Sequence, residues 1–537
     1  MITSTILLVL PELFQLLFIN IILLFALMYG SLSYKSAESS LYKAKWITPV
    51  LQVEPVTRAI TLGFICSAFL YYNNGLDSGF AFGLIWDDLC RFMSIFLCTC
   101  CAIALCLSTQ SLKRFSRYEF LLILWLSAIG MLCLIKSYSF LAIYLSLELQ
   151  SLSFYMLASM RSHNEASAEA GLKYFILSAF SSAMLLLGMT LIYGTIGCQS
   201  LGDLAMVLNH FLEVDPHGVS ELNPTTTRVV DIGLGCICIS LLFKLAAAPL
   251  HAWIADVYEG SHTSITAWFA ITAKIGVITI LIRLNIPYTL VMLLVLAAAT
   301  SLIVGSLSAM RQVKLKRFIA FSAVSNAGWF LLALTAGAWQ YMVLHLIVYT
   351  ILSINLFSVF ICPLLRSHPN LAYRTRIHSI KQSPALNIKH DTVDHGADSN
   401  AIKYISDLNQ IYKVNPGLAF AIATSMFSLA GIPPLAGFYS KYLIINAVSQ
   451  SQQYLLLAIS LIAAVISAFY YIRVVKTIYF STPLITVAAR GGLKQRTSWW
   501  FTIQECPINA YITALCTGLT LVFFIKPEYF TLWLALI

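Results

Sequence analysis

Long apolar runs recur along almost all of this 537-residue chain, and most are long enough to cross a bilayer as a helix. The composition agrees, because 59% of the residues are hydrophobic, only 10% are charged and the mean hydropathy is +0.82. A membrane β-barrel is excluded, since its strands would give alternating segments of about ten residues. We therefore expect an all-α polytopic membrane protein.

Hydropathy predicts about 14 transmembrane helices. The expected spans are 6–29, 58–72, 92–108, 118–135, 139–159, 170–195, 229–253, 263–283, 288–309, 318–336, 341–365, 415–447, 454–479 and 508–526. The first is predicted to be a retained helix, because no basic segment or small-residue cleavage site accompanies it.

The positive charges support an even number of spans. Of the 33 Lys and Arg side chains, 24 fall in loops on one side, five fall on the other side and four lie inside spans. Because basic residues favour the cytoplasmic or matrix side, both termini are predicted to face away from it. We attribute the net charge of +10 to this orientation and to contact with anionic lipids such as cardiolipin, and we expect no nucleic-acid partner.

Spans seven and twelve are each interrupted by proline with a lysine nearby. Lys244 precedes Pro249 in one, whereas Lys441 follows Pro433 and Pro434 in the other. Two broken helices in corresponding positions predict two inverted repeats, here of five helices each, with the transport site between them. The expected division has four parts. They are an N-terminal three-helix segment at 1–117, a first antiporter-like repeat at 118–285, a second antiporter-like repeat at 286–480 with a polar loop at 366–413, and a C-terminal loop with the last helix at 481–537.

Five ionisable side chains interrupt apolar spans, namely Glu148, Lys173, Lys244, Lys274 and Lys441. A charge at the bilayer centre costs roughly 2.5–3.5 kcal/mol on insertion scales, so such residues usually mark a path for ions. Burial favours the neutral form of a lysine, which lets it exchange a proton near neutral pH. We therefore predict proton translocation through these five residues, with the charge of Glu148 controlling whether Lys244 holds its proton.

Four of these residues have a structural alternative, and for Lys274 it is an anchor at the membrane interface. Glu148 could be a protonated acid bonded to a neighbouring helix, Lys244 could form only an interhelical salt bridge, and Lys173 could extend to the membrane surface. His251 and His345 are further candidate relay members. His251 could instead bond the backbone freed by Pro249, and His345 could be a satisfied core histidine.

We predict no metal or cofactor site in this chain. The 13 cysteines show no zinc-ligand spacing, and there is no convincing nucleotide fingerprint, iron–sulfur cluster motif or haem motif. The loop 366–413 contains four histidines in no standard metal-binding pattern and is expected to be solvated. Transport would then be driven by an ion gradient or by a partner that carries the redox chemistry.

Six segments in order along the chain resemble NADH–ubiquinone oxidoreductase (respiratory complex I) chain 2, the counterpart of bacterial subunit N. They are SLELQSLSFY at 146–155, EAGLKYF at 169–175, FKLAAAPLHAW at 243–253, DVYEG at 256–260, LKRFIAFS at 315–322 and LAGIPPLAGFYSK at 429–441. The sequence departs from this family at His262, where proline is usual, and at Leu250, where phenylalanine is common. These departures concern local loop shape.

The resemblance implies a proton-pumping antiporter-like subunit of the membrane arm. Glu148 would be the carboxylate of helix five, Lys173 the family lysine of helix six, Lys244 the broken-helix lysine, Lys274 the central relay and Lys441 the outlet. The chain would belong to NADH:ubiquinone reductase without holding a redox centre, since other subunits would bind FMN, iron–sulfur clusters and ubiquinone. A bound phospholipid is a further candidate ligand.

The resemblance also implies partners and a location. The neighbours would be the antiporter-like chain 4 and the small chains 4L and 6, with accessory subunits at loop 366–413. The expected location is the mitochondrial inner membrane, with both termini on the intermembrane-space side; a bacterial plasma membrane is the alternative. Two other functions stay open: a component of an Mrp-type cation/proton antiporter, and a scaffold whose charges only hold helices together.

Overall fold

The structure is a computed structural model. It describes residues 53–73, 79–81, 83–115, 119–161, 164–213, 224–284, 288–361, 364–367, 402–409, 411–480, 500–503 and 507–525. The predicted first span, 6–29, and the four histidines of the polar loop lie outside these residues.

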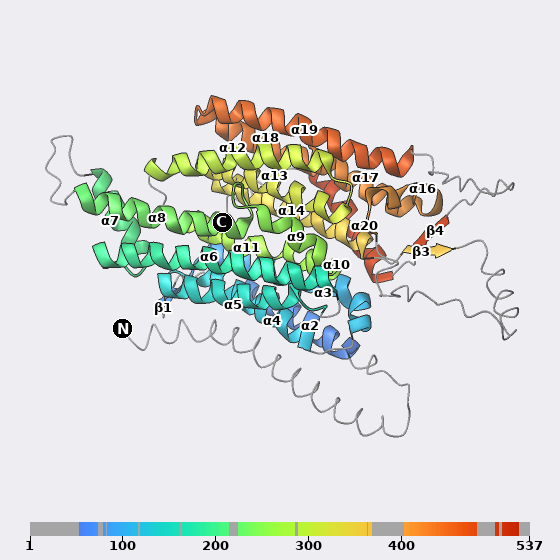
Figure 1. Ribbon diagram of the computed structural model, residues 1–537, viewed down its shortest axis with the longest axis horizontal. Coiled ribbons are helices and arrows are strands. Elements are labelled where there is room, and N and C mark those ends of the chain that lie inside the picture. The colour runs from blue at the N-terminus through green and yellow to red at the C-terminus, as the bar shows by residue number, and fades with distance from the viewer. Residues whose placement is uncertain are drawn as a thin grey trace, which may run out of the picture.

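The described residues form a bundle of long helices that lie side by side along the longest axis of the molecule (Figure 1). The N-terminal helices are α2 (Val53–Asn73), α3 (Asp88–Phe115), α4 (Glu119–Lys136), α5 (Phe140–Ala158) and α6 (Glu165–Ile196). The middle of the chain forms α8 (Pro224–Leu245), α9 (Ala252–Gly260), α10 (Thr263–Ile271), α11 (Ala273–Arg283), α12 (Tyr288–Arg311), α13 (Leu315–Thr335) and α14 (Trp339–Phe360). The C-terminal part adds α17 (Pro416–Ala430), α18 (Ala436–Gln450), α19 (Tyr454–Tyr479) and α20 (Pro507–Ile525).

The helices follow the predicted spans closely, and eight segments in the described part of the chain are long and apolar enough to cross a membrane. The chain is therefore a mostly helical, multi-pass membrane protein. Span seven is divided into α8 and α9, and span twelve into α17 and α18, as the prolines predicted. Span eight has an interruption that was not predicted, since α10 ends at Ile271 and α11 begins at Ala273.

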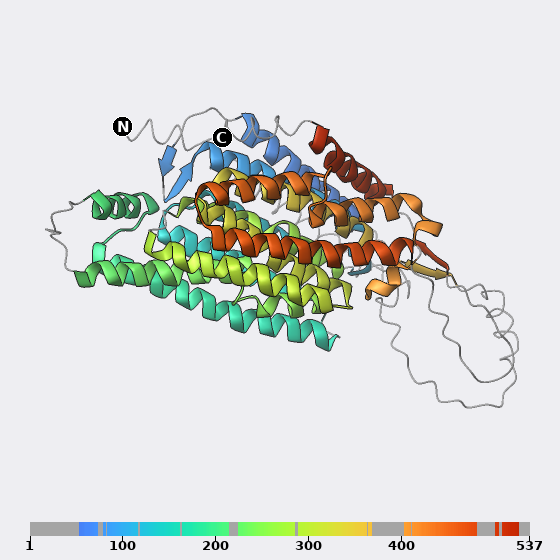
Figure 2. The ribbon, with the colours of Figure 1, turned by 90° about the horizontal axis from the view of Figure 1, so that it is seen from above.

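Short elements cap the two ends of the bundle (Figures 1 and 2). At one end lie α7 (Leu201–Glu213) and the antiparallel pair β1 (Gly79–Ala81) and β2 (Leu84–Trp86). At the other end lie α16 (Ile411–Val414), the 3₁₀ turn η2 (Ile405–Leu408) and the antiparallel pair β3 (Leu364–Ser367) and β4 (Trp500–Ile503). These small ladders were not predicted. Because β3 and β4 belong to loops assigned to the same side, their pairing agrees with the predicted alternation of those spans.

The break between α8 and α9 is stabilised by side chains that bind the released backbone carbonyls. Ala246 has a positive φ of 61°, which ends the regular helix. The indole of Trp253 donates to the carbonyl of Phe243 at 3.1 Å, and the hydroxyl of Thr300 donates to the carbonyl of Ala248 at 3.0 Å. Irregular backbone at membrane depth requires such partners, because no bulk water is available to supply them.

The second break is made by a glycine turn. Gly431 ends α17 in the left-handed conformation, with φ 84°, which glycine adopts without steric cost. The chain then returns as α18 so closely that a Cβ at Gly437 would lie 1.8 Å from the carbonyl oxygen of Ser428. The backbone N–H of Gly437 also donates a hydrogen bond to the Ser428 hydroxyl at 3.0 Å.

The helices α10, α11 and α14 are the most enclosed of the eight membrane-length segments. In the most apolar part of α14, 94% of the residues are buried, and in that of α10 and α11 the share is 89%. The corresponding share is 33% in both α6 and α19. The exposed faces of α6 and α19 are apolar and suit contact with lipid. Polar side chains on α11 and α14 are therefore kept from lipid by surrounding protein.

Candidate functional site

A line of hydroxyl groups joins Glu148 to Lys244. Glu148, Ser151 and Tyr155 lie on one face of α5, because they are three and four residues apart. The Ser151 hydroxyl lies 3.4 Å from Oε2 of Glu148 and interacts with the Tyr155 hydroxyl, which donates to Ser178 on α6. Nζ of Lys244 donates to the same Ser178 hydroxyl at 2.6 Å.

This arrangement places the predicted carboxylate and lysine in one site without direct contact. Within the described part of the chain, the two side chains form no ion pair with each other. Hydroxyl groups instead separate the carboxylate of Glu148 from the amine of Lys244. Hydroxyl groups both donate and accept hydrogen bonds, so Ser151, Tyr155 and Ser178 offer a route between them.

Lys274 lies in a second, more enclosed site. It follows the interruption between α10 and α11 and is only 4% exposed. Its Nζ donates to the hydroxyl of Tyr349 on α14 at 3.1 Å and lies 4.2 Å from the centre of the tyrosine ring. Both contacts favour the charged amine, the second through the negative face of the ring.

The same helix α14 connects this site to the second break. His345 lies one turn before Tyr349, and its Nδ1 is 3.1 Å from the hydroxyl of Ser440 on α18. The adjacent Lys441 donates from Nζ to the carbonyl of Leu429 at 2.6 Å, a carbonyl in the last turn of α17. A backbone carbonyl at the end of α17, next to the break, therefore accepts a hydrogen bond from the buried amine.

The second site thus brings together Lys274, His345 and Lys441, which are between 3% and 6% exposed. Nε2 of His345 is buried and finds no partner among the described residues. Because imidazole can accept a proton on one nitrogen and release one from the other, this position suits a relay member.

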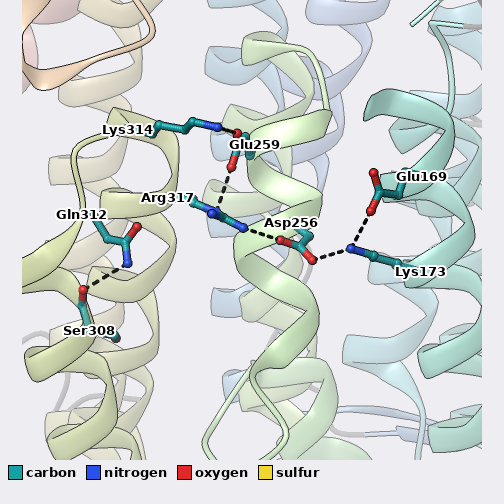
Figure 3. Close-up of polar contacts among 8 residues, drawn as sticks. All are labelled: Glu169, Lys173, Asp256, Glu259, Ser308, Gln312, Lys314 and Arg317. Carbon is teal, nitrogen blue, oxygen red and sulfur yellow. Dashed lines mark hydrogen bonds and ion pairs between the residues drawn. The ribbon is translucent and has the colours of Figure 1, made fainter. Parts of the chain in front are cut away.

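Lys173 belongs to neither site. It lies toward one end of α6 and binds Glu169 at 2.7 Å and Asp256 of α9 at 2.8 Å (Figure 3). Arg317 of α13 binds the other oxygen of Asp256 at 2.8 Å and also Glu259. The hydrogen bond from Lys173, assisted by Arg317, holds the pKa of Asp256 below its usual value despite partial burial. The Lys173 side chain is 43% exposed, so this residue is not sealed at membrane depth.

His251 lies in the first break, two residues after Pro249, and its ring centre is 6.3 Å from that of Phe321. Its Nδ1 is buried and finds no hydrogen-bond partner in the described residues. The two roles of His251, relay member or partner of the backbone freed by Pro249, stay predictions. No described residue connects His251 to either lysine site through a hydrogen bond.

Several residues of these sites were not found from the sequence. The hydroxyls of Tyr155, Ser178, Tyr349 and Ser440 each contact a predicted residue or its partner. One signal was present, since Ser151 and Tyr155 share the helical face of Glu148. Among the described residues, no three His, Cys, Asp or Glu side chains are grouped to hold a metal ion.

The sequence matches the family model described as NADH:quinone oxidoreductase/Mrp antiporter, transmembrane, over residues 137–467. The NADH-ubiquinone oxidoreductase chain 2 of Marchantia polymorpha is 35% identical over 425 residues, which cover 78% of this chain and 77% of the relative. The NADH-quinone oxidoreductase subunit N of Pelagibacter ubique is 33% identical over 430 residues, covering 78% and 81%.

The fold is also found in solved structures. A chain of the respiratory complex I from Thermus thermophilus matches with a TM-score of 0.73 at 23% identity, covering 96% of this chain and 98% of that one. A chain of the Mrp complex from Dietzia matches with a TM-score of 0.70 at 17% identity, covering 96% and 95%. The chain therefore belongs to the NADH:quinone oxidoreductase/Mrp antiporter family, and within it to NADH-ubiquinone oxidoreductase chain 2, the counterpart of NADH-quinone oxidoreductase subunit N.

Proposed function

We propose that this chain translocates protons as an antiporter-like subunit in the membrane arm of respiratory complex I. The observation that carries the proposal is the pair of sites built at the two broken helices: Lys244 is bridged by hydroxyls toward Glu148, and buried Lys274, His345 and Lys441 follow along α14. A proton would enter at the first site and leave through Lys441. Lys173 would act from the ion-pair network beside this path.

The proposed driving force is quinone reduction in other subunits. A change in the charge or position of Glu148 would alter the stability of the proton on Lys244, because two unit charges about 6 Å apart at an effective dielectric near 20 interact by roughly 2.8 kcal/mol. The chain would thus take part in the NADH:ubiquinone reductase reaction without binding FMN, iron–sulfur clusters or ubiquinone itself. The names of its relatives support membership in such a complex.

We further propose 14 spans, with five-helix repeats at 118–285 and 286–480 and both termini on the side opposite the basic loops. The broken helices α8–α9 and α17–α18 support the repeats, since each carries an intramembrane lysine. The proposed neighbours are the chain 4, 4L and 6 subunits, together with anionic lipid. We place the protein in the mitochondrial inner membrane, with the bacterial plasma membrane as the alternative.

The test uses the intact complex reconstituted in liposomes, in which protons moved per electron are measured. Lys244→Met and Glu148→Gln should each lower this ratio by the number of protons that this subunit moves per electron, while the complex still assembles. Lys476→Met is the matched control, because Lys476 is exposed in the last turn of α19 and should leave the ratio unchanged. Normal pumping in both site variants would instead support the scaffold function.

An Mrp-type cation/proton antiporter is the second candidate, because the matching family model covers both groups. The chain 2 and subunit N relatives favour the first. The two functions separate when sodium transport is followed in the same liposomes with a quinone-site inhibitor present. Sodium-dependent proton movement that resists the inhibitor would support the antiporter.

A further inference from the structure

A cavity of about 330 Å³ opens among the loops at the end of the bundle that carries the basic residues. This cavity, called here the basic cavity, is lined by the charged residues Arg161, Glu259, Lys314, Lys316 and Lys403, and Ser261 is one of its hydroxyl residues. These residues come from the connection between α5 and α6, the end of α9 with its connection to α10, the start of α13, and the segment before η2. Figure 3 shows the edge of this region at Lys314 and Glu259.

Positive charge in the basic cavity exceeds negative charge. With four basic side chains and one carboxylate in the lining, the formal net charge of the basic cavity is +3. The single carboxylate, Glu259, already binds Lys314 and Arg317. Arg161 and Lys403 both lie close enough to Lys316 for their charges to repel it. Burial also lowers the pKa of Arg161 to about 10, which marks a cation partly removed from water.

Helix ends add to this positive potential. The helices α6, α10 and α13 begin at the cavity, with Asn164, His262 and Lys314 as their N-cap residues. The N-terminus of a helix carries a partial positive charge and favours an anion. At α13 the N-cap side chain makes no capping hydrogen bond, so this end is not neutralised by its own cap.

A buried hydroxyl in the lining lacks a partner. Ser261 is 2% exposed, and its Oγ forms no hydrogen bond with the described residues. Leaving a buried polar group without a hydrogen-bond partner is unfavourable, so such groups are usually satisfied. The carbonyl of the same residue accepts a hydrogen bond from Nζ of Lys316 at 2.7 Å, which leaves the ammonium group with two further donors. A ligand oxygen between them would satisfy both residues.

We propose that the basic cavity binds a phosphate-bearing anion, with Arg161, Lys316, Lys403 and the Ser261 hydroxyl as its ligands. Phosphate offers several acceptor oxygens, which matches a guanidinium, two ammonium groups and a hydroxyl at one place. The volume lies at the lower end of the range of small-molecule sites, about 300–1,000 Å³. The phosphate could belong to an anionic phospholipid headgroup or to free phosphate.

The expected test is protection of Lys403, which is exposed, from an amine-reactive label in the intact complex. The complex is placed in phosphatidylcholine nanodiscs, and labelling is mapped by mass spectrometry with and without inorganic phosphate. A second preparation contains phosphatidylglycerol and no free phosphate. Protection only by phosphatidylglycerol identifies the headgroup, and protection by inorganic phosphate identifies the free anion. Lys413, which is also exposed but does not line the cavity, serves as the internal control.

Two variants make the test specific. Arg161→Gln should raise the anion concentration needed for protection about 10-fold or more, because a charge-assisted hydrogen bond is lost. Ser261→Ala should also weaken protection, although it removes a hydroxyl that has no partner among the described residues. The proposal is overturned if neither anion protects Lys403, if Lys403 is covered and never labelled, or if protection is the same in both variants as in the unaltered chain.

Discussion

Lys244 and Ser178 lie 2.6 Å apart, and the same serine hydroxyl accepts a hydrogen bond from Tyr155. The lysine at the first helix break is therefore connected to α5 through a side chain of α6. Ser178 is fully buried, so water from outside cannot readily replace its hydroxyl. Communication between Glu148 and Lys244 would depend on this bridge.

Ser178→Ala should slow proton pumping about 10-fold or more while leaving the complex assembled. The variant removes the acceptor of a charge-assisted hydrogen bond, which is worth about 1.5–3 kcal/mol. The measurement is the initial rate of proton uptake in proteoliposomes. Ser182→Ala on the same helix is the control, since the Ser182 hydroxyl binds only the carbonyl of Ala179. Equal rates in the two variants would rule out the hydroxyl bridge.

Tyr349→Phe should impair pumping less than Tyr349→Leu. Phenylalanine keeps the ring over which Nζ of Lys274 lies at 4.2 Å but loses the hydroxyl acceptor at 3.1 Å, whereas leucine loses both contacts. Proton-to-electron ratios of the two variants give the comparison. Tyr341→Phe, earlier on α14 and only partly buried, should behave as the unaltered protein. If leucine were tolerated as well as phenylalanine, the ring contact would have no role.

Gly437→Ala should prevent the two halves of span twelve from packing. The added Cβ would lie 1.8 Å from the backbone oxygen of Ser428, which no side-chain rotation can relieve. Overpacking of this kind costs about 1–3 kcal/mol or more. Gly518→Ala is the control because a Cβ there meets nothing within 4 Å. The yield of assembled complex distinguishes them, and equal yields would contradict the close approach of α17 and α18.

The contribution of Asp256 to stability should disappear in acid. Lys173, with Arg317, holds the pKa of Asp256 below its usual value, so the ionised carboxylate stabilises the folded chain above the ordinary carboxyl pKa of about 3.9. That stability is lost as the pH falls through the lower pKa of the folded state. The melting temperatures of the unaltered protein and Asp256→Asn should therefore differ at neutral pH and converge in acid.

A control separates this effect from general acid damage. Glu169→Gln removes the other partner of Lys173, but the Glu169 side chain is 64% exposed. Exposed ion pairs contribute little, so its melting temperature should stay near that of the unaltered protein at neutral pH. A constant gap between Asp256→Asn and the unaltered protein at all pH values would show that the carboxylate charge is not responsible.

The helices could be predicted because their driving force is local in sequence. Apolar runs located the described spans, and the prolines at 249, 433 and 434 located two breaks. The interruption after α10 has no such signal. There the hydroxyl of Thr272 donates to the carbonyl of Trp268 at 2.8 Å, a local bond that competes with regular helix geometry but is common for threonine.

For a related reason, the sequence predicted the charged residues of the candidate site but not its hydroxyl residues. A lysine or glutamate in an apolar span is rare and therefore informative, whereas Ser178, Tyr349 and Ser440 are ordinary in such helices. Their importance arises from which helices become neighbours, as when α6 brings Ser178 to Lys244. Lys173 is the opposite case. Its position in an apolar span is visible in the sequence, but its ion pairs with Glu169 and Asp256 are not.

The two oxygens of Asp256 bind cations from different halves of the chain, Lys173 on α6 and Arg317 on α13. A rotation or shift of α9 would pull on both partners at once. Because one carboxylate binds both flanking helices, their displacements can be correlated. A displacement on one side of the bundle can then be transmitted to the other side in a single step.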